Sequence, residues 1–463
     1  MIRIFRHYIS GVYLVLFVLE MGVFFAAFYV GNMLRFYSAE HFLTPAPDLL
    51  HPAIIFTVVM LLCSIGMGLY QRAHDISAAG LTLRILTSFI LGSAVMSLVF
   101  YALPEFFVGR GVFGYALLSA FVGVLAGRVL FRKFVDRQSI RRRVLVLGAG
   151  YRGNMIQDFD GRAENQRVRI IGYVPMGKEP VRVNVGKLIN LPTGLNEYAA
   201  KADIDEIVVA PDDRRDGLAV DEILDCKMAG LDVVDLLTFF EREAGLLRVD
   251  CLNPSWLVFS DGFRLNGARL IGKRLFDIVA SLALLAVVWP VMLLTALAIL
   301  IESGWRQPIL YRQVRVGLNW ELFKVIKFRS MRTDAEKHGA QWARTNDDRI
   351  TRVGGFIRKC RIDELPQLFN VLQGDMSFVG PRPERPEFVE KFAETIPYYS
   401  ERHRVKPGIT GWAQLCYPYG SNYQDAIEKL QYDLYYVKNY SLFLDMLIML
   451  ETIEVVLWGK GAR

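Results

Sequence analysis

The sequence predicts a membrane protein in three parts. A four-helix transmembrane bundle over residues 1–140 is followed by an α/β domain over 141–262, and then by a mainly α (α+β) monotopic domain over 263–463 with a re-entrant membrane helix. Three observations lead to this fold class. The chain of 463 residues is 53% hydrophobic, and four apolar runs fill its first third. Strand and helix patterns alternate after them, and a later apolar run has basic residues on both flanks.

The four apolar runs lie at about Ile9–Leu34, Ala53–Tyr70, Leu81–Leu103 and Val112–Val135. Each is near the roughly 20 residues that a helix needs to cross a bilayer. Basic residues gather before the first run (Arg3 and Arg6), at the second connection (Arg72, with Arg84 flanking it at the start of the third run) and from the end of the fourth run onward (Arg128 and Arg141–Arg143). The first and third connections carry only Arg35 and Arg110. Because basic residues favour the cytoplasmic side, both ends of the bundle should face the cytoplasm.

One acidic residue, Glu20, interrupts the first run. A carboxylate inside a membrane is costly and often functional. A role in packing helices together explains it equally well, so both roles stay open at this point.

A glycine pattern opens the α/β part. The apolar strand Val144–Leu147 leads directly into Gly148, Gly150 and Gly153, which match the dinucleotide-binding fingerprint between a strand and a helix. That fingerprint also requires an acid at the end of the second strand, to hold the ribose. The second strand, Val168–Val174, ends without one. We therefore expect a Rossmann-like accessory domain in which NAD is not bound. The glycines form either a tight turn or a nucleotide loop.

The apolar run at about residues 276–301 has an unusual setting. It is long enough to span a bilayer, yet basic residues flank it on both sides, at Lys273 and Arg274 before it and at Arg306 and Arg312 after it. A true span would place one of these clusters on the wrong side. Pro290 in the middle of the run removes a helix hydrogen bond. A helix that enters the membrane, breaks at Pro290 and leaves on the same face resolves the conflict; an ordinary fifth span is the alternative.

Asp363 and Glu364 stand where a helix begins. The apolar spacing over 365–372 is helical, and Pro366 is tolerated only in a first turn. Asp363 should therefore lie at or next to the N-cap, and capping is the simplest explanation for it. The same position stabilises a carboxylate and attracts phosphate groups. An ionised Asp363 can attack phosphorus if Mg²⁺ (or Mn²⁺), held by Glu364 and Asp363, and arginines cancel the repulsion.

Cationic residues surround this acidic pair in the sequence. The candidates for binding substrate phosphates are Lys327, Arg329, Arg358, Arg361 and Arg382. A run of charge is usually just a solvated face. Here arginines stand among glycines and prolines, as in Gly380–Glu384, and rigid turns hold a guanidinium in place for bidentate phosphate recognition.

Five motifs occur in order in the last 190 residues or so, at Tyr311–Gly317, Lys327–Met331, Asp363–Gln367, Gly374–Glu384 and Lys406–Trp412. With them, the stretch from about Gly272 to Arg463 resembles the bacterial sugar transferase family, the polyprenyl-phosphate hexose-1-phosphate transferases. The whole chain resembles the long form of the family used in exopolysaccharide synthesis, whose re-entrant helix fits the kink at Pro290. One small departure is Asp348, where many members have proline.

The resemblance implies a reaction and its residues. Asp363 would attack the β-phosphorus of a UDP-sugar, expel UMP and form a phosphosugar-aspartyl intermediate, which undecaprenyl (polyprenyl) phosphate would then attack. Glu364 would bind Mg²⁺, and Lys327, Arg358 and Arg382 would hold phosphates. The protein would lie in the bacterial inner membrane with its catalytic domain on the cytoplasmic face. Downstream glycosyltransferases would extend the product; the middle domain could mediate a homodimer, and no nucleic acid is expected.

Two other functions remain as alternatives. A membrane-anchored, NAD-dependent sugar-nucleotide enzyme would use the glycine loop, but such enzymes of the short-chain type need a Tyr-x-x-x-Lys base, and the sequence contains none. Tyr198 and Lys201 are one residue too close. A non-enzymatic nucleotide-sensing membrane scaffold would explain the middle domain but would leave Asp363 and the arginines without a role.

Overall fold

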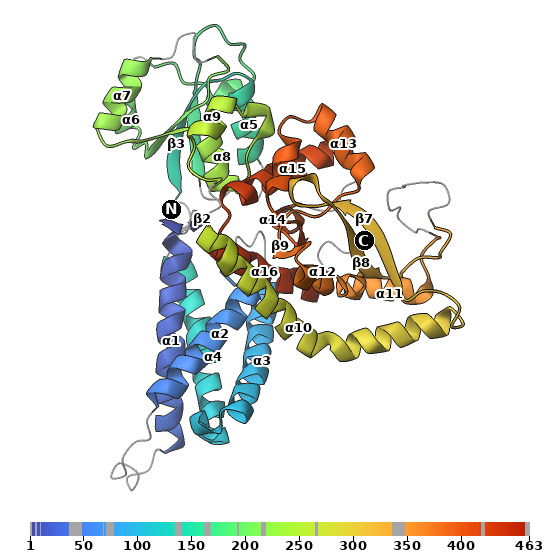
Figure 1. Ribbon diagram of the computed structural model, residues 1–463. Coiled ribbons are helices and arrows are strands. Elements are labelled where there is room, and N and C mark those ends of the chain that lie inside the picture. Colours follow the sequence, from blue (N-terminus) through green and yellow to red (C-terminus); the bar gives the residue numbers. More distant parts are fainter. Residues whose placement is uncertain are drawn as a thin grey trace.

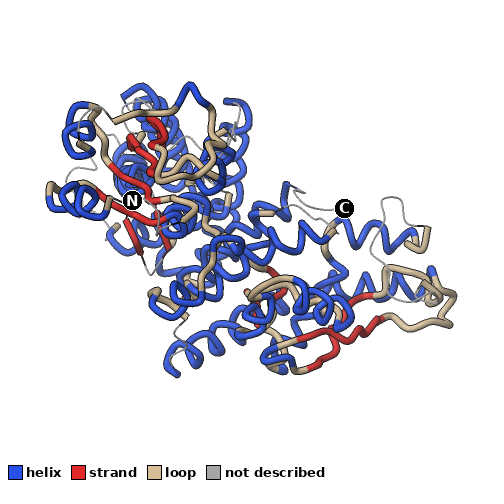
Figure 2. The backbone as a smooth tube through the Cα atoms, turned by 90° about the horizontal axis from the view of Figure 1, so that it is seen from above, coloured by secondary structure: helices blue, strands red, loops and turns tan. Residues whose placement is uncertain are grey.

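The computed structural model describes residues 2–4, 7–9, 11–36, 49–67, 69–70, 78–134, 141–161, 168–191, 194–213, 219–263, 267–335, 348–417 and 422–458. The basic residues Arg6 and Arg72, used above for orientation, lie outside these ranges. A helical bundle, an α/β domain and a C-terminal region (267–458) follow one another along the chain (Figure 1). Figure 1 shows the α/β domain above the bundle, and both views place the C-terminal region to one side (Figures 1 and 2).

Four helices form the bundle expected from the four apolar runs: α1 (Gly11–Arg35), α2 (Leu50–Gly66), α3 (Ala78–Ala102) and α4 (Arg110–Phe134). Three of them contain segments long and apolar enough to cross a membrane. Helix α2 has only 17 residues, or about 26 Å at 1.5 Å per residue, which is shorter than the roughly 30 Å of a bilayer core. Among the described residues, the fourth segment long and apolar enough to cross a membrane is Arg269–Glu302, in the C-terminal region. A short antiparallel hairpin, β1 (Ile2–Ile4) with β2 (His7–Ile9), precedes α1.

Glu20 pairs two helices of the bundle. Its Oε1 atom lies 2.6 Å from Nε of Arg128 on α4, and its Oε2 atom accepts hydrogen bonds from Arg128 Nη2 at 3.1 Å and from the Tyr70 hydroxyl. Arg128 also donates to the Leu69 carbonyl oxygen at 3.2 Å. Both charged side chains are buried. This geometry favours the packing role for Glu20, because the carboxylate joins α1 to α4 and to the chain after α2.

The α/β domain is built on a four-stranded parallel sheet in the order β4-β3-β5-β6, so the predicted parallel sheet is confirmed. Its strands are β3 (Arg142–Leu147), β4 (Val168–Val174), β5 (Glu206–Val209) and β6 (Asp232–Asp235). Its helices are α5 (Tyr151–Asp160), α6 (Leu195–Lys201), α7 (Val220–Met228) and α8 (Leu236–Ala244), with the short turn η3 (Val185–Lys187). The central residues of the strands are mostly apolar, as expected where helices cover both faces of such a sheet.

The C-terminal region is mainly helical and contains two small sheets. After η4 (Val249–Cys251) and α9 (Pro254–Phe259), its helices are α10 (Gly267–Glu302), α11 (Arg352–Lys359), α12 (Gln367–Gln373), α13 (Pro386–Thr395), α14 (Trp412–Cys416), α15 (Tyr423–Lys438) and α16 (Leu442–Trp458). Strands β7 (Leu310–Val316) and β8 (Leu322–Phe328) form an antiparallel hairpin, whereas β9 (Ser377–Val379) and β10 (Gly408–Thr410) are parallel. The 3-10 turns are η5 (Leu318–Trp320), η6 (Ile362–Glu364) and η7 (Tyr399–Arg404).

Helix α10 is longer than the run predicted from the sequence. It continues for 36 residues, and Pro290 lies inside it rather than at an interruption. Figure 1 shows that the helix bends along its length, as an interior proline requires, because the proline removes one hydrogen bond without ending the helix. Large apolar side chains along it are exposed, among them Val287, Leu294 and Ile301. Such a surface requires an apolar partner.

The α/β domain and the C-terminal region share a buried interface. Glu241 on α8 pairs with Lys438 at 2.6 Å and accepts a hydrogen bond from Asn439 at 3.0 Å, at the end of α15. Trp412 donates from its indole nitrogen to the Gly245 carbonyl oxygen at 2.8 Å. Apolar side chains of both parts belong to one contiguous core. The two parts are therefore fixed to each other by packing as well as by hydrogen bonds.

Replacing Arg128 by Leu should destabilise the bundle by roughly 3–5 kcal/mol, because Glu20 would remain buried without its partner. Replacing both residues by Leu should recover most of that loss. The measurement is the free energy of unfolding in mixed detergent micelles. Arg110→Leu, at the exposed start of α4, is the matched control and should change little. A double variant that is at least as unstable as Arg128→Leu would contradict the pairing.

Candidate active site

The turn between α11 and α12 carries Asp363 and Glu364. Helix α11 ends before Arg361, whose φ of 58° lies in the left-handed region that non-glycine residues rarely adopt. The chain then makes the 3-10 turn η6, which holds both acids. The N-cap of α12 is Pro366, so the predicted N-cap position of Asp363 is wrong. The reason is that η6 has already begun to turn the chain before α12 starts.

Glu364 is the anion around which the basic side chains gather. Its Oε1 atom lies 2.9 Å from Arg382 Nη2, 3.1 Å from Lys327 Nζ and 3.8 Å from Arg361 Nη1. The residue is 8% exposed, and burial alone would raise the pKa of its carboxyl group. The three cations outweigh burial and hold the pKa of Glu364 well below its usual value. Glu364 is therefore ionised throughout the physiological pH range.

Asp363 lies beside this cluster, but its carboxyl group is in a different situation. It is 9% exposed, and it makes no hydrogen bond or ion pair with any residue of the described ranges. Burial, and then repulsion by Glu364, raises the pKa of Asp363, while Lys327, Arg358 and Arg382 act to lower it. Its carboxylate oxygens thus remain available for a ligand, next to cations that attract anions.

Arg358 and Arg329 retain donors that no described group accepts. Arg358 is close enough to lower the pKa of Asp363, and its Nη1 atom is buried without a hydrogen bond. Arg329 donates to Gln307, and its Nε atom is buried and unpaired as well. A buried donor without a partner is costly, so both side chains suit an anionic ligand. Of the predicted phosphate-binding residues, Lys327, Arg358, Arg361 and Arg382 lie around the acidic pair, whereas Arg329 lies against Gln307.

Asn370 was not predicted from the sequence, yet it fixes α12 to strand β8. Its Nδ2 atom donates to the Lys324 carbonyl oxygen at 2.8 Å, and its Oδ1 atom accepts from the Ile326 amide at 3.0 Å. The Asn370 side-chain amide thus makes hydrogen bonds with the backbone of β8 that a neighbouring strand would otherwise make. It sets the distance between Glu364, just before α12, and Lys327 on β8. The sequence signal that could have identified Asn370 is its polar side chain among the apolar positions of α12.

The glycine loop between β3 and α5 is closed by two acidic side chains. Asp212 accepts hydrogen bonds from the amides of Tyr151 and Arg152, both at 2.8 Å. Glu179 accepts from the Ala149 amide at 2.6 Å. These amides are the donors that a bound pyrophosphate would need. Two carboxylates of the protein therefore already occupy the anion position of the loop.

Close packing accounts for the three glycines of the loop. A Cβ atom at Gly148, where φ is 127°, would lie 2.2 Å from the Ala210 carbonyl oxygen. At Gly150 it would lie 2.2 Å from the Asp212 carboxylate, and at Gly153 it would lie 2.4 Å from the Gly148 carbonyl oxygen. The tight-turn role is thus sufficient to explain the pattern.

The acidic pair is the place where a divalent cation could bind. Within the described residues, no group of three or more His, Cys, Asp and Glu side chains could hold a metal ion. Mg²⁺ often uses only one or two carboxylates together with water and substrate phosphates. Asp363, with its free oxygens, and the adjacent Glu364 fit a site of this open kind, which a bound phosphate would complete.

Comparison with known proteins identifies the region that contains this site. The family described as "Bacterial sugar transferase" matches residues 268–459, which include the acidic pair and all the predicted phosphate-binding residues. The α/β domain and the helical bundle lie outside this match.

Three relatives extend the comparison. A protein of Aeromonas hydrophila, described as a UDP-N-acetylgalactosamine-undecaprenyl-phosphate N-acetylgalactosaminephosphotransferase, is 44% identical over 51% of this chain and 55% of its own length. A UDP-glucose:undecaprenyl-phosphate glucose-1-phosphate transferase of Klebsiella pneumoniae is 37% identical over 62% of this chain and 61% of its own length. A protein of the same description from Xanthomonas campestris pv. campestris is 32% identical over 77% of this chain and 75% of its own length.

The extent of these matches differs between relatives. The chain spans little more than half the length of the first two, at 55% and 61%, but three quarters of the third. The match to the third relative therefore extends well beyond the C-terminal region. Together with the matching family and the geometry around Asp363 and Glu364, it shows that this chain belongs to the bacterial sugar transferase family.

Proposed function

We propose that the protein transfers a hexose 1-phosphate from a UDP-sugar to undecaprenyl phosphate and releases UMP. The observation that carries the proposal is the buried Asp363 carboxyl group, which has no partner in the described ranges and lies near Lys327, Arg358 and Arg382. The relatives' names support the same reaction class, with UDP-N-acetylgalactosamine or UDP-glucose as donor. The product would begin an exopolysaccharide, capsule or O-antigen, which downstream glycosyltransferases extend.

In the first step, an ionised Asp363 oxygen attacks the β-phosphorus of the UDP-sugar. A bond forms between this oxygen and phosphorus, and the bond from phosphorus to the bridging oxygen breaks. The bridging oxygen leaves with the electron pair as part of UMP. Lys327, Arg358 and Arg382 hold the phosphate oxygens and neutralise the charge that would otherwise repel the carboxylate. The sugar phosphate is then attached to Asp363.

In the second step, a phosphate oxygen of undecaprenyl phosphate attacks the same phosphorus. The bond to Asp363 breaks, and the carboxylate leaves with its electron pair. The product is undecaprenyl diphosphate linked to the sugar. Both leaving groups, UMP and a carboxylate, are stable anions, so neither step depends on a strong general acid.

A divalent cation, Mg²⁺ or Mn²⁺, would be held by Glu364 and Asp363 together with the donor diphosphate. When bound, it would neutralise part of the diphosphate charge. Glu364 has a second role in this proposal, because it holds Lys327 and Arg382 in place before the substrate arrives. Pre-organised cations need no rearrangement during the reaction.

The exposed apolar surface of α10 supports a position at a membrane, where lipid phosphate and soluble nucleotide both reach the site. In this proposal α10 is a re-entrant helix that bends at Pro290 and leaves the membrane on the face it entered. The membrane is the bacterial inner membrane, and Asp363 lies on the cytoplasmic side. The α/β domain is an accessory, Rossmann-like unit that could also join two copies of the chain.

NAD has no place in the proposed reaction. The carboxylates of Asp212 and Glu179 accept the amide hydrogen bonds that a dinucleotide would require, which supports a structural role for the glycine loop. A membrane-anchored NAD-dependent enzyme and a nucleotide-sensing scaffold would both leave Asp363 and its cations unused.

Asp363→Asn should abolish UMP release, with a loss of roughly three orders of magnitude or more, because an amide cannot act as the nucleophile. The assay measures UMP from a panel of UDP-sugars, including UDP-glucose and UDP-N-acetylgalactosamine, with undecaprenyl phosphate and Mg²⁺. The matched control is Asp348→Asn, an exposed residue of the same region. Wild-type rates in the Asp363 variant would exclude it as nucleophile.

Lys327→Met should shift the acid limb of the pH–rate profile to higher pH. Asp363 must be ionised to attack, so the rate falls as the pH falls through its pKa. Burial already raises this pKa above its ordinary value of about 3.9, and Lys327 opposes that rise. The measurement is kcat/KM across the acidic range, with Lys359→Met on the exposed face of α11 as the charge-matched control. If the acid limb of Lys327→Met moved to lower pH, the assignment of Asp363 as the group that must be ionised would be contradicted.

A further inference from the structure

The loop of residues 380–385, between β9 and α13, is held from outside rather than by its own hydrogen bonds. Pro381 and Pro383 flank Arg382, and neither has a backbone N–H group. The Arg382 carbonyl oxygen instead accepts a hydrogen bond from Arg402 Nη2 at 3.0 Å. The side chain of the same Arg382 reaches Glu364 Oε1 at 2.9 Å. Arg402 therefore contacts the main chain of a residue whose side chain lies in the active site.

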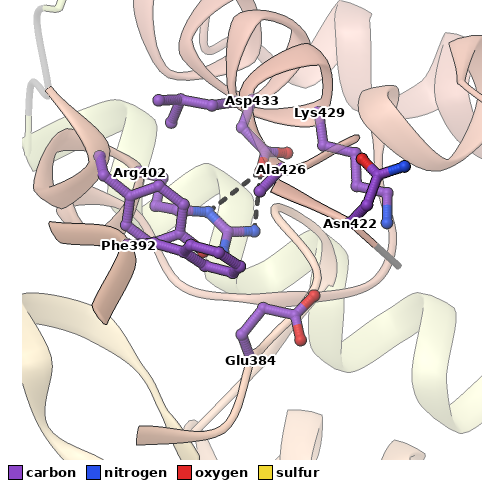
Figure 3. Close-up of a pocket in the computed structure, with 9 residues that line it drawn as sticks. Glu384, Phe392, Arg402, Asn422, Ala426, Lys429 and Asp433 are labelled. Carbon is purple, nitrogen blue, oxygen red and sulfur yellow. Dashed lines mark hydrogen bonds and ion pairs between the residues drawn. The ribbon is translucent and has the colours of Figure 1, made fainter. Parts of the chain in front are cut away.

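The side chain of Arg402 is buried and bound on several sides. It is 6% exposed, and Asp433 on α15 accepts from its Nε atom at 3.1 Å and from its Nη2 atom at 2.8 Å. Its Nη1 atom donates to the Tyr399 hydroxyl at 2.9 Å. Figure 3 shows Arg402 and Asp433 facing each other in a small cavity, with Glu384 from the same loop on one side of it. All three nitrogen atoms of the guanidinium thus have a partner in a fixed direction.

Stability alone does not explain this buried pair. Removing two charges from water is costly, and apolar residues of similar volume often stabilise a protein as well or better. An apolar pair, however, would leave the Arg382 carbonyl oxygen without this donor. A guanidinium can bind Asp433, Tyr399 and the loop at once because its donors form a rigid planar fork, which a lysine does not provide.

We propose that Arg402, oriented by Asp433, is a positioning residue that holds the Arg382 loop against the Asp363–Glu364 turn. This inference rests on the proposed transfer reaction, and it concerns a residue that does not touch the reacting atoms. A displacement of about 1 Å at a group that binds phosphate can cost on the order of 100-fold in rate. Arg402 would therefore matter for the reaction through Arg382 alone.

The first test compares Arg402→Lys with Arg404→Lys in the full chain, kept in lipid nanodiscs. Arg404 is an exposed neighbour that pairs with Glu401, three residues away, and it is the matched control. Arg402→Lys should lower kcat/KM for the UDP-sugar by roughly 10- to 100-fold, and Arg404→Lys should leave it unchanged. Equal kinetics of Arg402→Lys and wild type would overturn the proposal.

A double-mutant cycle separates positioning from general structural damage. If Arg402 acts through Arg382, then Arg402→Lys combined with Arg382→Ala should be no slower than Arg382→Ala alone. If the two losses multiply instead, Arg402 acts by another route and the proposal fails. A second variant, Arg402→Met with Asp433→Leu, should keep its melting temperature but lose activity to a similar degree. Full activity in that folded variant would also overturn the proposal.

A measurement that does not depend on activity keeps this inference distinct from the proposed function. Hydrogen exchange of peptides covering residues 377–390 should be faster in Arg402→Lys than in Arg404→Lys, whatever the protein catalyses. If the wild-type protein releases no UMP from any UDP-sugar, the transfer reaction is rejected. The exchange rates of Arg402→Lys and Arg404→Lys would still test whether Arg402 holds the Arg382 loop. Unchanged exchange would show that Arg402 does not hold the loop.

Discussion

One buried carboxylate, that of Glu364, determines where the basic side chains of the site lie. Lys327 comes from β8, Arg361 from the turn before η6 and Arg382 from the loop before α13, and all three approach the same oxygen atom. Cations placed this close in a buried site would repel one another without an anion between them. With Glu364 present, they are already in position when a diphosphate arrives. Asp363, the preceding residue, makes no ion pair with any described residue, because Lys327, Arg361 and Arg382 pair with Glu364 instead.

A second charged network joins the long helix α10 to this arrangement. Lys273 on α10 pairs with Asp445 on α16 at 2.8 Å and donates to the Val379 carbonyl oxygen at 3.1 Å. Asp277, one turn later, accepts from the Ser377 hydroxyl at 3.0 Å. Arg274 donates to the carbonyl oxygen of Leu372, in the last turn of α12, at 2.6 Å. The apolar helix is therefore fixed to β9, which leads into the Arg382 loop, and to α12, which follows the Asp363 turn.

Much of this molecule could be predicted from local patterns. The four apolar runs, the parallel sheet and the acidic pair each follow from residues that are neighbours in the chain, or from a period that one element repeats. Two details differ from the expectation, and both differences have local physical causes. The run with Pro290 continues as one bent helix, because a proline removes only one hydrogen bond. Asp363 lies before the N-cap of α12, because a 3-10 turn precedes that helix.

The sequence by itself determined which chemistry is available: two adjacent carboxylates, several basic residues among prolines and glycines, and apolar segments for a membrane. Only the tertiary structure decided how these groups are used. Among the described residues, it paired three cations with Glu364 and none directly with Asp363, placed Asp212 against the glycine loop, and joined Asn370 and Arg402 to distant backbone atoms. Such contacts join residues far apart in the chain, and a polar side chain carries no local signal of the carbonyl or carboxylate that it will meet after folding.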